Sequence, residues 1–296
     1  MFPASFLTTI EDSIGDRVSN YFDLIVGTST GGIIALGLGL GLPAKDILSF
    51  YEEKGSAIFK GNKLFRGVIQ LFSPKYNVPL LRNALETIFK QDLSLGESTT
   101  RLVIPSFNLD TGEVHVYKTA HHQRFERDYK ENVVDIALAT SAAPAYFKTH
   151  FTSKGIPLID GGIYANNPVG LSVVEAIGVL GWEKESLKVL SIGCTTEPLN
   201  VSSKKKGCCY WGLKSADVFL TAQSSLSLGT AKLLAGHENI IRISPQVFPG
   251  RFKIDFIKGM KSLKGLGDSE ARKAMPLLHH IFFDKTANDF VPFYKL

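Results

Sequence analysis

A serine between two glycines is the first feature of the chain that could carry out chemistry. The segment Gly27-Thr28-Ser29-Thr30-Gly31 has the spacing G-x-S-x-G, which places a serine hydroxyl on a sharp turn between a strand and a helix. A mostly apolar run precedes the segment and a second apolar run follows it, as that setting requires. The helix N-terminus behind Ser29 would leave amide N–H groups free for a developing oxyanion. The pattern predicts a nucleophile for acyl transfer, and the alternative is a plain Gly/Ser turn.

The serine hydroxyl needs a base, and the sequence offers two kinds. Three histidines follow Ser29 in the order Ser, Asp/Glu, His, but hydrolases with that order place several strands ahead of the serine, and only 28 residues precede Ser29. Asp160 is the better candidate, because it ends an apolar run and is followed by Gly161 and Gly162. Those glycines would let the backbone bend sharply and bring the carboxylate close to another loop. An ordinary Asp-Gly turn is the alternative. The histidines are His237, His279 and His280.

Alternating helical and strand patterns must position these groups. Apolar residues at helical spacing predict helices over 2–11, 33–40, 44–59, 80–89, 133–140, 169–180 and 215–234, and the remaining chain after 243 also looks helical. Short apolar runs predict strands over 22–26, 101–107, 114–118, 156–159, 188–192 and 240–243. Asp110-Thr111-Gly112 predicts a hairpin turn between two of these strands. This alternation favours an α/β sandwich around a mostly parallel sheet.

The composition is that of a globular protein. The chain has 296 residues, of which 44% are hydrophobic and 21% charged, so a largely disordered protein is excluded. This length allows one large domain or two small ones. Since no internal repeat or long linker interrupts the chain, we expect a single domain over 1–296.

Net charge and cysteine content limit the partners and the cellular compartment that the protein could have. A net charge of +5 is too small to indicate a nucleic-acid polymer as partner, although it is compatible with an anionic membrane surface. Three cysteines cannot form a disulfide framework and suit a reducing compartment. The longest apolar run, 33–42, is about half a membrane span, and the first residues do not resemble a signal peptide. We therefore expect a soluble or peripheral cytoplasmic protein.

Three motifs together resemble one family. The segments Gly27 to Gly32, Ala139 to Pro144, and Asp160-Gly161-Gly162 with Asn166-Asn167-Pro168 occur in the order found in patatin-like phospholipases. The resemblance covers about residues 2–192, and residues 193–296 would complete or extend the domain. It implies a three-layer α/β sandwich of the patatin type and a Ser–Asp dyad without histidine. The implied activity is hydrolysis of ester bonds in phospholipids or related acyl lipids.

The resemblance also implies roles for individual residues. Ser29 would be the nucleophile, Asp160 the base, and the Thr30 N–H an oxyanion donor. No metal or cofactor would be required. The glycines that would shape the nucleophile turn and the base are Gly27, Gly31, Gly161 and Gly162, and the segments 141–144 and 166–168 would support the site.

One part of the family pattern is absent from the sequence. The family carries an Asp-Gly-Gly-Gly loop, which supplies most of the oxyanion hole, just before the helix that here starts near Phe2. Loss of even one oxyanion donor costs on the order of 10²–10³ in rate. We expect a chain that lacks its first strand and loop rather than a crippled hydrolase. The alternatives are a catalytically impaired sensor or scaffold with this fold, and a soluble esterase.

A narrower resemblance concerns regulation. The segments 117–122 and 135–141 look like a bacterial branch of the family whose members degrade membranes in anti-phage defence and are activated by cyclic GMP-AMP. This resemblance implies a cyclic dinucleotide activator that promotes homo-oligomer assembly or opens the site, and action at the inner membrane. Basic residues within 60–75 are candidates for binding the dinucleotide by charge alone.

Two further patterns favour structural explanations. His279-His280 has no carboxylate or cysteine at ligand spacing, so the sequence does not predict a metal site there. The glycines at 37, 39 and 41 lie within a predicted helix rather than at a strand–helix turn. They therefore indicate close helix packing and not a dinucleotide fingerprint.

Overall fold

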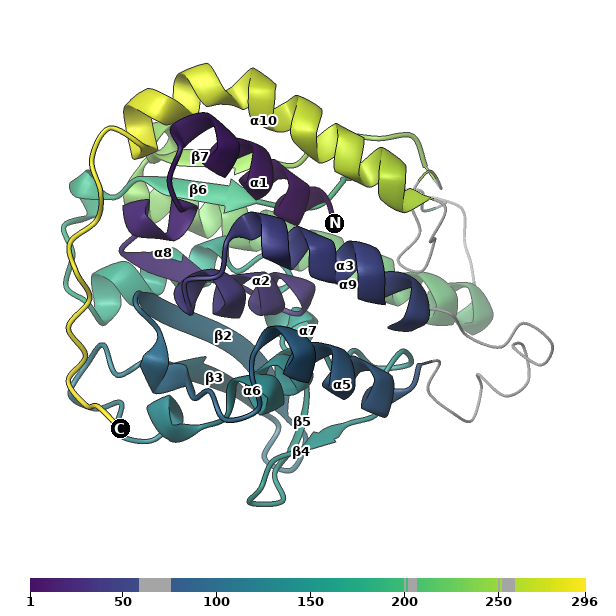
Figure 1. Cartoon of the computed structure of the whole chain (residues 1–296). Helices are drawn as coiled ribbons and strands as arrows, with labels where there is room; N and C mark the ends of the chain where they lie inside the picture. Colours follow the sequence, from purple (N-terminus) through teal and green to yellow (C-terminus); the bar gives the residue numbers. More distant parts are fainter. Residues whose placement is uncertain (59–75, 200, 202–206, 250, 252–258) are drawn as a thin grey trace.

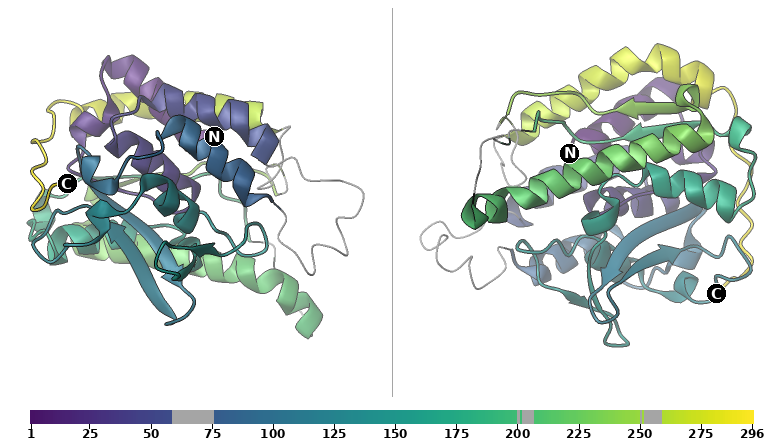
Figure 2. Two further views of the ribbon diagram at one scale, coloured as in Figure 1. Left: turned by 60° about the horizontal axis from the view of Figure 1, so that its bottom comes forward. Right: turned by 180° about the vertical axis from the view of Figure 1, so that it is seen from behind.

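A β-sheet lies between two groups of helices, as the views in Figure 1 and Figure 2 show. The computed structural model describes residues 1–58, 76–199, 201, 207–249, 251 and 259–296. The predicted three-layer α/β sandwich is confirmed. The basic residues within 60–75 that could bind a dinucleotide lie outside the described residues.

The central sheet is mixed, whereas the sequence predicts a mostly parallel one. Strands β1 and β2 are parallel, but β2 runs antiparallel to β3 and β5, and β4 is antiparallel to β5. The tight turn predicted at 110–112 joins β2 to β3, and strands joined by so short a turn must be antiparallel. Strands β6 and β7 form a separate parallel pair. The strands are β1 (Leu24–Val26), β2 (Arg101–Asn108), β3 (Glu113–Lys118), β4 (His150–Phe151), β5 (Pro157–Asp160), β6 (Val189–Ile192) and β7 (Ile240–Ile243).

Two hydrophobic cores hold the helices on the sheet. The larger core joins α1, α2, α3, α5, α6 and α10 to strands β2 and β5. The smaller core joins α8 and α9 to the β6–β7 pair, and the right view of Figure 2 shows the long helix α9 crossing that face. The helices are α1 (Phe2–Ile14), α2 (Thr30–Gly39), α3 (Ala44–Ile58), α5 (Val78–Ile88), α6 (Val133–Thr140), α7 (Gly162–Ala165), α8 (Val169–Gly178), α9 (Cys208–Ala235) and α10 (Met260–Phe282).

Helix α2, which follows the serine motif, packs unusually closely on its neighbours. A Cβ atom at Gly37 would lie 2.7 Å from the Cδ1 of Ile47, and one at Gly39 would lie 2.6 Å from the side chain of Leu102. Only glycine fits at such distances. The predicted role of Gly37 and Gly39 in close packing is therefore confirmed, and it fixes α2 against α3 and β2. The prediction that Gly41 lies within the helix is wrong, because α2 ends at Gly39 and Gly41 forms a turn with φ 74°.

The chain end differs from the sequence prediction. Helix α10 ends at Phe282, and the residues after it contain no helix. They run along the surface, as the yellow trace in Figure 1 shows. The Phe293 N–H donates a hydrogen bond to the Ala120 carbonyl at 2.7 Å, and the ring of Tyr294 stacks on Tyr129. Helical spacing of apolar residues is thus not sufficient where the chain finds its hydrogen bonds and packing on another element.

Among the helices that the structure describes, none has both the length and the apolar character that a membrane crossing requires.

Candidate active site

The serine motif forms the turn between β1 and α2, with Ser29 directly before the helix. Its backbone has φ 58° and ψ −129°, a region that a residue with a side chain occupies only under strain. A Cβ atom at Gly27 would lie 2.2 Å from the Gly31 carbonyl oxygen, so this position must be glycine. A Cβ at Gly31 would meet nothing within 4 Å, so space alone does not require that glycine.

Ser29 and Asp160 are in direct contact, although 131 residues separate them in the chain. The Ser29 hydroxyl donates a hydrogen bond to Asp160 Oδ2 at 2.6 Å. Asp160 is the last residue of β5 and the Gly162 N–H donates to its other oxygen, Oδ1, at 2.7 Å. A Cβ at Gly161 would lie 2.4 Å from the Pro105 carbonyl oxygen. The absence of that atom lets the Asp160 strand end approach β2.

Burial gives the Asp160 carboxylate the properties of a base. The residue is only 5% exposed, and no ion pair reaches it from any described residue. Burial therefore raises the pKa of Asp160 to about 6, even though the hydrogen bonds from Ser29 and Gly162 favour the charged form. At neutral pH the carboxylate is ionised and can still take up a proton at low cost.

Thr140 links the turn at Ser29 to strand β2 through its side-chain hydroxyl. The sequence alone did not indicate this role. Its Oγ1 accepts a hydrogen bond from the Ser29 N–H at 3.1 Å and donates one to the Pro105 carbonyl at 2.6 Å. A Cβ at Gly32 would lie 2.8 Å from Thr140 Cγ2, so the two segments are packed tightly. The only signal in the sequence was its place within the second family motif.

The Thr30 N–H, predicted to be an oxyanion donor, lies at the first residue of α2. The described part of the chain provides no acceptor for it, and Thr30 lines the same cavity as Ser29. Because the first amides of a helix have no partner within the helix, this N–H is free to bind a ligand oxygen.

The two supporting segments also reach the site. The Ala142 carbonyl accepts a hydrogen bond from the Asp160 N–H at 3.1 Å. Asn167 Oδ1 accepts a hydrogen bond from the Val169 N–H at the start of α8, at 3.4 Å. The Asn166 N–H donates a hydrogen bond to the Gln223 side chain of α9. These contacts join β5, α8 and α9 around the carboxylate.

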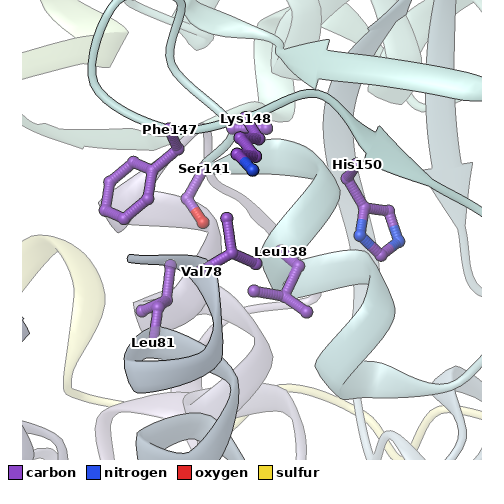
Figure 3. Close-up of a pocket in the computed structure, with 8 residues that line it drawn as sticks. Val78, Leu81, Leu138, Ser141, Phe147, Lys148 and His150 are labelled. Atoms are coloured by element: carbon purple, nitrogen blue, oxygen red, sulfur yellow. The ribbon is translucent and has the colours of Figure 1, made fainter. Parts of the chain in front are cut away.

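A large cavity opens onto the dyad. It has a volume of about 2250 Å³, and Ser29 and Asp160 both line it. Much of its wall is apolar, including side chains of Phe50 and Ile34, and it extends between β1 and β6. A second hollow, drawn in Figure 3, lies between α5 and α6 beside Ser141 and measures about 10 Å³, roughly one water molecule. Of these two hollows, the large one has the volume for an acyl chain.

The histidines that could have completed a triad do not line this cavity. A carboxylate lies beside the histidine pair, contrary to the prediction from the sequence. His279 Nδ1 is 3.3 Å from Asp284 Oδ1, and the nearest ligand atoms of His279, His280 and Asp284 lie within 4.8 Å of one another. All three residues are exposed, and they form no contact with the dyad.

Comparison with known proteins agrees with this fold. The profile of the family described as patatin-like phospholipase matches residues 2–172. The chain belongs to the patatin-like phospholipase family, and it is accordingly a hydrolase.

Three bacterial relatives carry the name cGAMP-activated phospholipase. The one from Pseudomonas aeruginosa is 32% identical and the match covers 93% of this chain and 85% of the relative. The one from Escherichia coli is 34% identical, covering 79% and 71%. The one from Vibrio cholerae is 30% identical, covering 83% and 78%. The similarity therefore extends well beyond the residues matched by the family profile.

Proposed function

We propose that the protein hydrolyses acyl ester bonds of membrane phospholipids through a Ser29–Asp160 dyad. The observation that carries the proposal is the 2.6 Å hydrogen bond between Ser29 Oγ and the buried Asp160 carboxylate. The strained turn at Ser29 supports it, because such strain is typical of functional positions. A sensor or scaffold that had lost catalysis would have no need to keep this arrangement.

The chemistry proceeds in two acyl transfers. Asp160 takes the proton of Ser29 while Oγ bonds to the acyl carbon, and the Thr30 N–H binds the oxyanion. The ester C–O bond then breaks, and the leaving lysophospholipid alcohol receives the proton from Asp160. Water attacks the acyl-enzyme with Asp160 again as base. The Oγ–acyl bond breaks, Ser29 recovers its proton, and a fatty acid leaves.

The names of the three bacterial relatives support cyclic GMP-AMP as an activator of this protein. In this proposal the dinucleotide promotes homo-oligomer assembly or opens the cavity, and the protein then acts at the inner membrane surface in anti-phage defence. The net charge of +5 favours contact with anionic lipid. The dinucleotide would then confine hydrolysis to the moment when its signal is present.

Fatty acid release from phospholipid vesicles, with and without cyclic GMP-AMP, tests the proposal. We expect release that depends on the dinucleotide and that Ser29→Ala and Asp160→Asn each abolish. Ser13→Ala and Asp110→Asn are matched controls, since both side chains are exposed and neither lines the cavity that contains the dyad. Release that survives either dyad substitution would exclude the mechanism, and a full rate without the dinucleotide would exclude the activator.

A further inference from the structure

Ser106 is a buried hydroxyl beside the proposed base, and the family motifs do not include it. It lies on β2, which at this position pairs with β3 on one side and with β5 on the other (Figure 1). The residue is 0% exposed, and its Oγ has no hydrogen-bond partner among the described residues. A buried hydroxyl without a partner is costly, so its presence in the core requires an explanation.

The strand register places Ser106 directly opposite Asp160. In an antiparallel pair, the side chains of opposite residues project to the same face of the sheet. The Asp160 N–H donates to the Ala142 carbonyl and not to β2. The two residues therefore form a non-hydrogen-bonded pair, in which the Cα atoms are about 4.5 Å apart and the side chains are closest. This arrangement puts the Ser106 hydroxyl next to the carboxylate that contacts Ser29.

The Asp160 carboxylate has room for a further donor. Its Oδ2 accepts one hydrogen bond from Ser29 and its Oδ1 accepts one from Gly162, whereas each carboxylate oxygen can accept two. A serine side chain has three staggered positions about χ1, so its Oγ can turn toward either neighbouring strand. The Ser106 hydroxyl can therefore donate to Asp160 without a change in the backbone.

Among the described residues, no charged group stabilises the ionised form of Asp160. Burial raises its pKa to about 6, and only the hydrogen bonds from Ser29 and Gly162 oppose that rise. One further donor would therefore strongly influence whether the base is ionised. The titratable residues on the strands and helices beside β5, none of which shifts the pKa of Asp160, are Arg101 on β2, Asp135 on α6, His150 on β4 and Tyr164 on α7.

We propose that the Ser106 hydroxyl donates a hydrogen bond to the Asp160 carboxylate and keeps it ionised until Ser29 gives up its proton. Ser106 is then a positioning residue, since it acts through Asp160 and does not touch the lipid. The same bond gives the buried hydroxyl the partner that it otherwise lacks among the described residues. This inference rests on the proposed function, because it adds a third residue to the same dyad.

The pH dependence of kcat/KM tests the role of Ser106, with soluble dihexanoyl phosphatidylcholine as substrate and saturating cyclic GMP-AMP. The headgroup of this lipid does not titrate near neutral pH, so the midpoint of the profile reports on the protein. Ser106→Ala should move the midpoint upward by about one pH unit, because the charged form of Asp160 loses a donor. At pH 6 kcat/KM should fall roughly fivefold, whereas at pH 8.5 it should stay within about twofold of the wild type.

Ser106→Thr keeps a hydroxyl on the same Cβ and should keep the wild-type midpoint. Ser98→Ala is the matched control, because Ser98 is also a buried serine but donates to the Gly39 and Thr100 carbonyls and does not line the cavity. Its midpoint should not move, and a shift equal to that of Ser106→Ala would overturn the inference. An unchanged midpoint in Ser106→Ala would also overturn it, and would leave His115 Nε2, the buried group opposite Ser106 on β3, as the partner of the hydroxyl.

A titration without substrate separates this inference from the proposed function. The Asp160 side-chain carboxyl is followed by ¹³C NMR in the wild type and in Ser106→Ala, and its signal is assigned by its loss in Asp160→Asn. The pKa of Asp160 should be about one unit higher in Ser106→Ala. If the wild type released no fatty acid, the proposed function would fail while this titration still decided the role of Ser106. An unchanged pKa would reject that role even in an active phospholipase.

Discussion

Two buried carboxylates, Asp160 and Glu175, differ sharply in their surroundings. Asp160 contacts a hydroxyl and an amide, and burial raises its pKa to about 6. Glu175, on α8, is 2% exposed and contacts Lys118 Nζ at 2.6 Å and His121 Nε2 at 2.9 Å. Burial alone would raise the pKa of Glu175, but the hydrogen bonds from His121 and Lys118 outweigh it and lower the value.

The pKa values of the two carboxylates shift in opposite directions because their neighbouring charges differ, since both side chains are almost fully buried. A carboxylate that faces cations stays ionised and holds two elements together, here α8 and the end of β3. A carboxylate that faces only neutral donors exchanges its proton near neutral pH and can act as a base. The two residues should therefore respond to mutation in opposite ways.

The largest expected effect is on catalysis. Asp160→Asn should lower kcat/KM for phospholipid by on the order of 10⁴, since an amide cannot take the proton of Ser29. Glu175→Gln should leave kcat/KM of the folded protein within about threefold, because Glu175 does not touch the reacting atoms. Initial rates of fatty acid release, normalised to folded protein, measure both. A large rate loss in Glu175→Gln would break the distinction.

The second effect is on stability and reverses the order of the two variants. Glu175→Gln should lower the free energy of unfolding by about 3 kcal/mol, because it leaves the mostly buried Lys118 ammonium without its counter-charge. Asp160→Asn should leave the protein at least as stable as the wild type at pH 8. The raised pKa of Asp160 means that its favourable contribution exists at low pH and is lost as the pH rises through about 6. Urea unfolding at pH 8 tests both expectations.

The third effect concerns pH. Asp160 must be ionised to accept a proton, so kcat/KM should rise through pH 6 and fall about tenfold between pH 7 and pH 5. Glu175→Gln should keep the same midpoint, since Glu175 titrates outside the site. A pH–rate profile without a rise near pH 6 would show that Asp160 is not the base.

The smallest effects come from two threonines that occupy comparable places. Thr140 Oγ1 accepts a hydrogen bond from the Ser29 N–H at 3.1 Å, and Thr119 Oγ1 accepts one from the Leu102 N–H at 3.0 Å while contacting His121. Each Thr→Val change should cost about 1–2 kcal/mol of stability. Only Thr140→Val should also lower kcat, by about tenfold, because it loosens the nucleophile turn. Thr→Ser at either site keeps the hydroxyl and serves as the control.

The features that could be predicted from the sequence are those with local signals. The serine turn has an apolar strand before it, glycines within it and a helical period after it, and the structure has each of these elements in place. Helix α6 occurs at the predicted residues, and Asn132 begins it by accepting hydrogen bonds from Val134 and Asp135. Capping and periodicity act over a few residues, so they can be identified without the fold.

The features that could not be predicted depend on contacts between distant segments. The Thr140 contact with Ser29 spans 111 residues, the contact between His121 and Glu175 spans 54, and that between Arg242 and Asn167 spans 75. In the sequence Glu175 resembles an ordinary charged helix residue, and Arg242 resembles an interruption of an apolar strand. No local pattern in the sequence indicates that β5 runs antiparallel to β2. The mixed character of the sheet therefore could not be predicted from the sequence.

The left-handed backbone of Ser29 has a consequence for the history of such a protein. A glycine at this position would relieve the strain, so stability and chemistry favour different residues there. Under the proposed mechanism, selection or engineering for thermal stability alone would therefore favour loss of the hydroxyl that acts as the nucleophile. The serine can persist only where the hydrolytic product benefits the cell, and drift in its absence would be expected to begin at this turn.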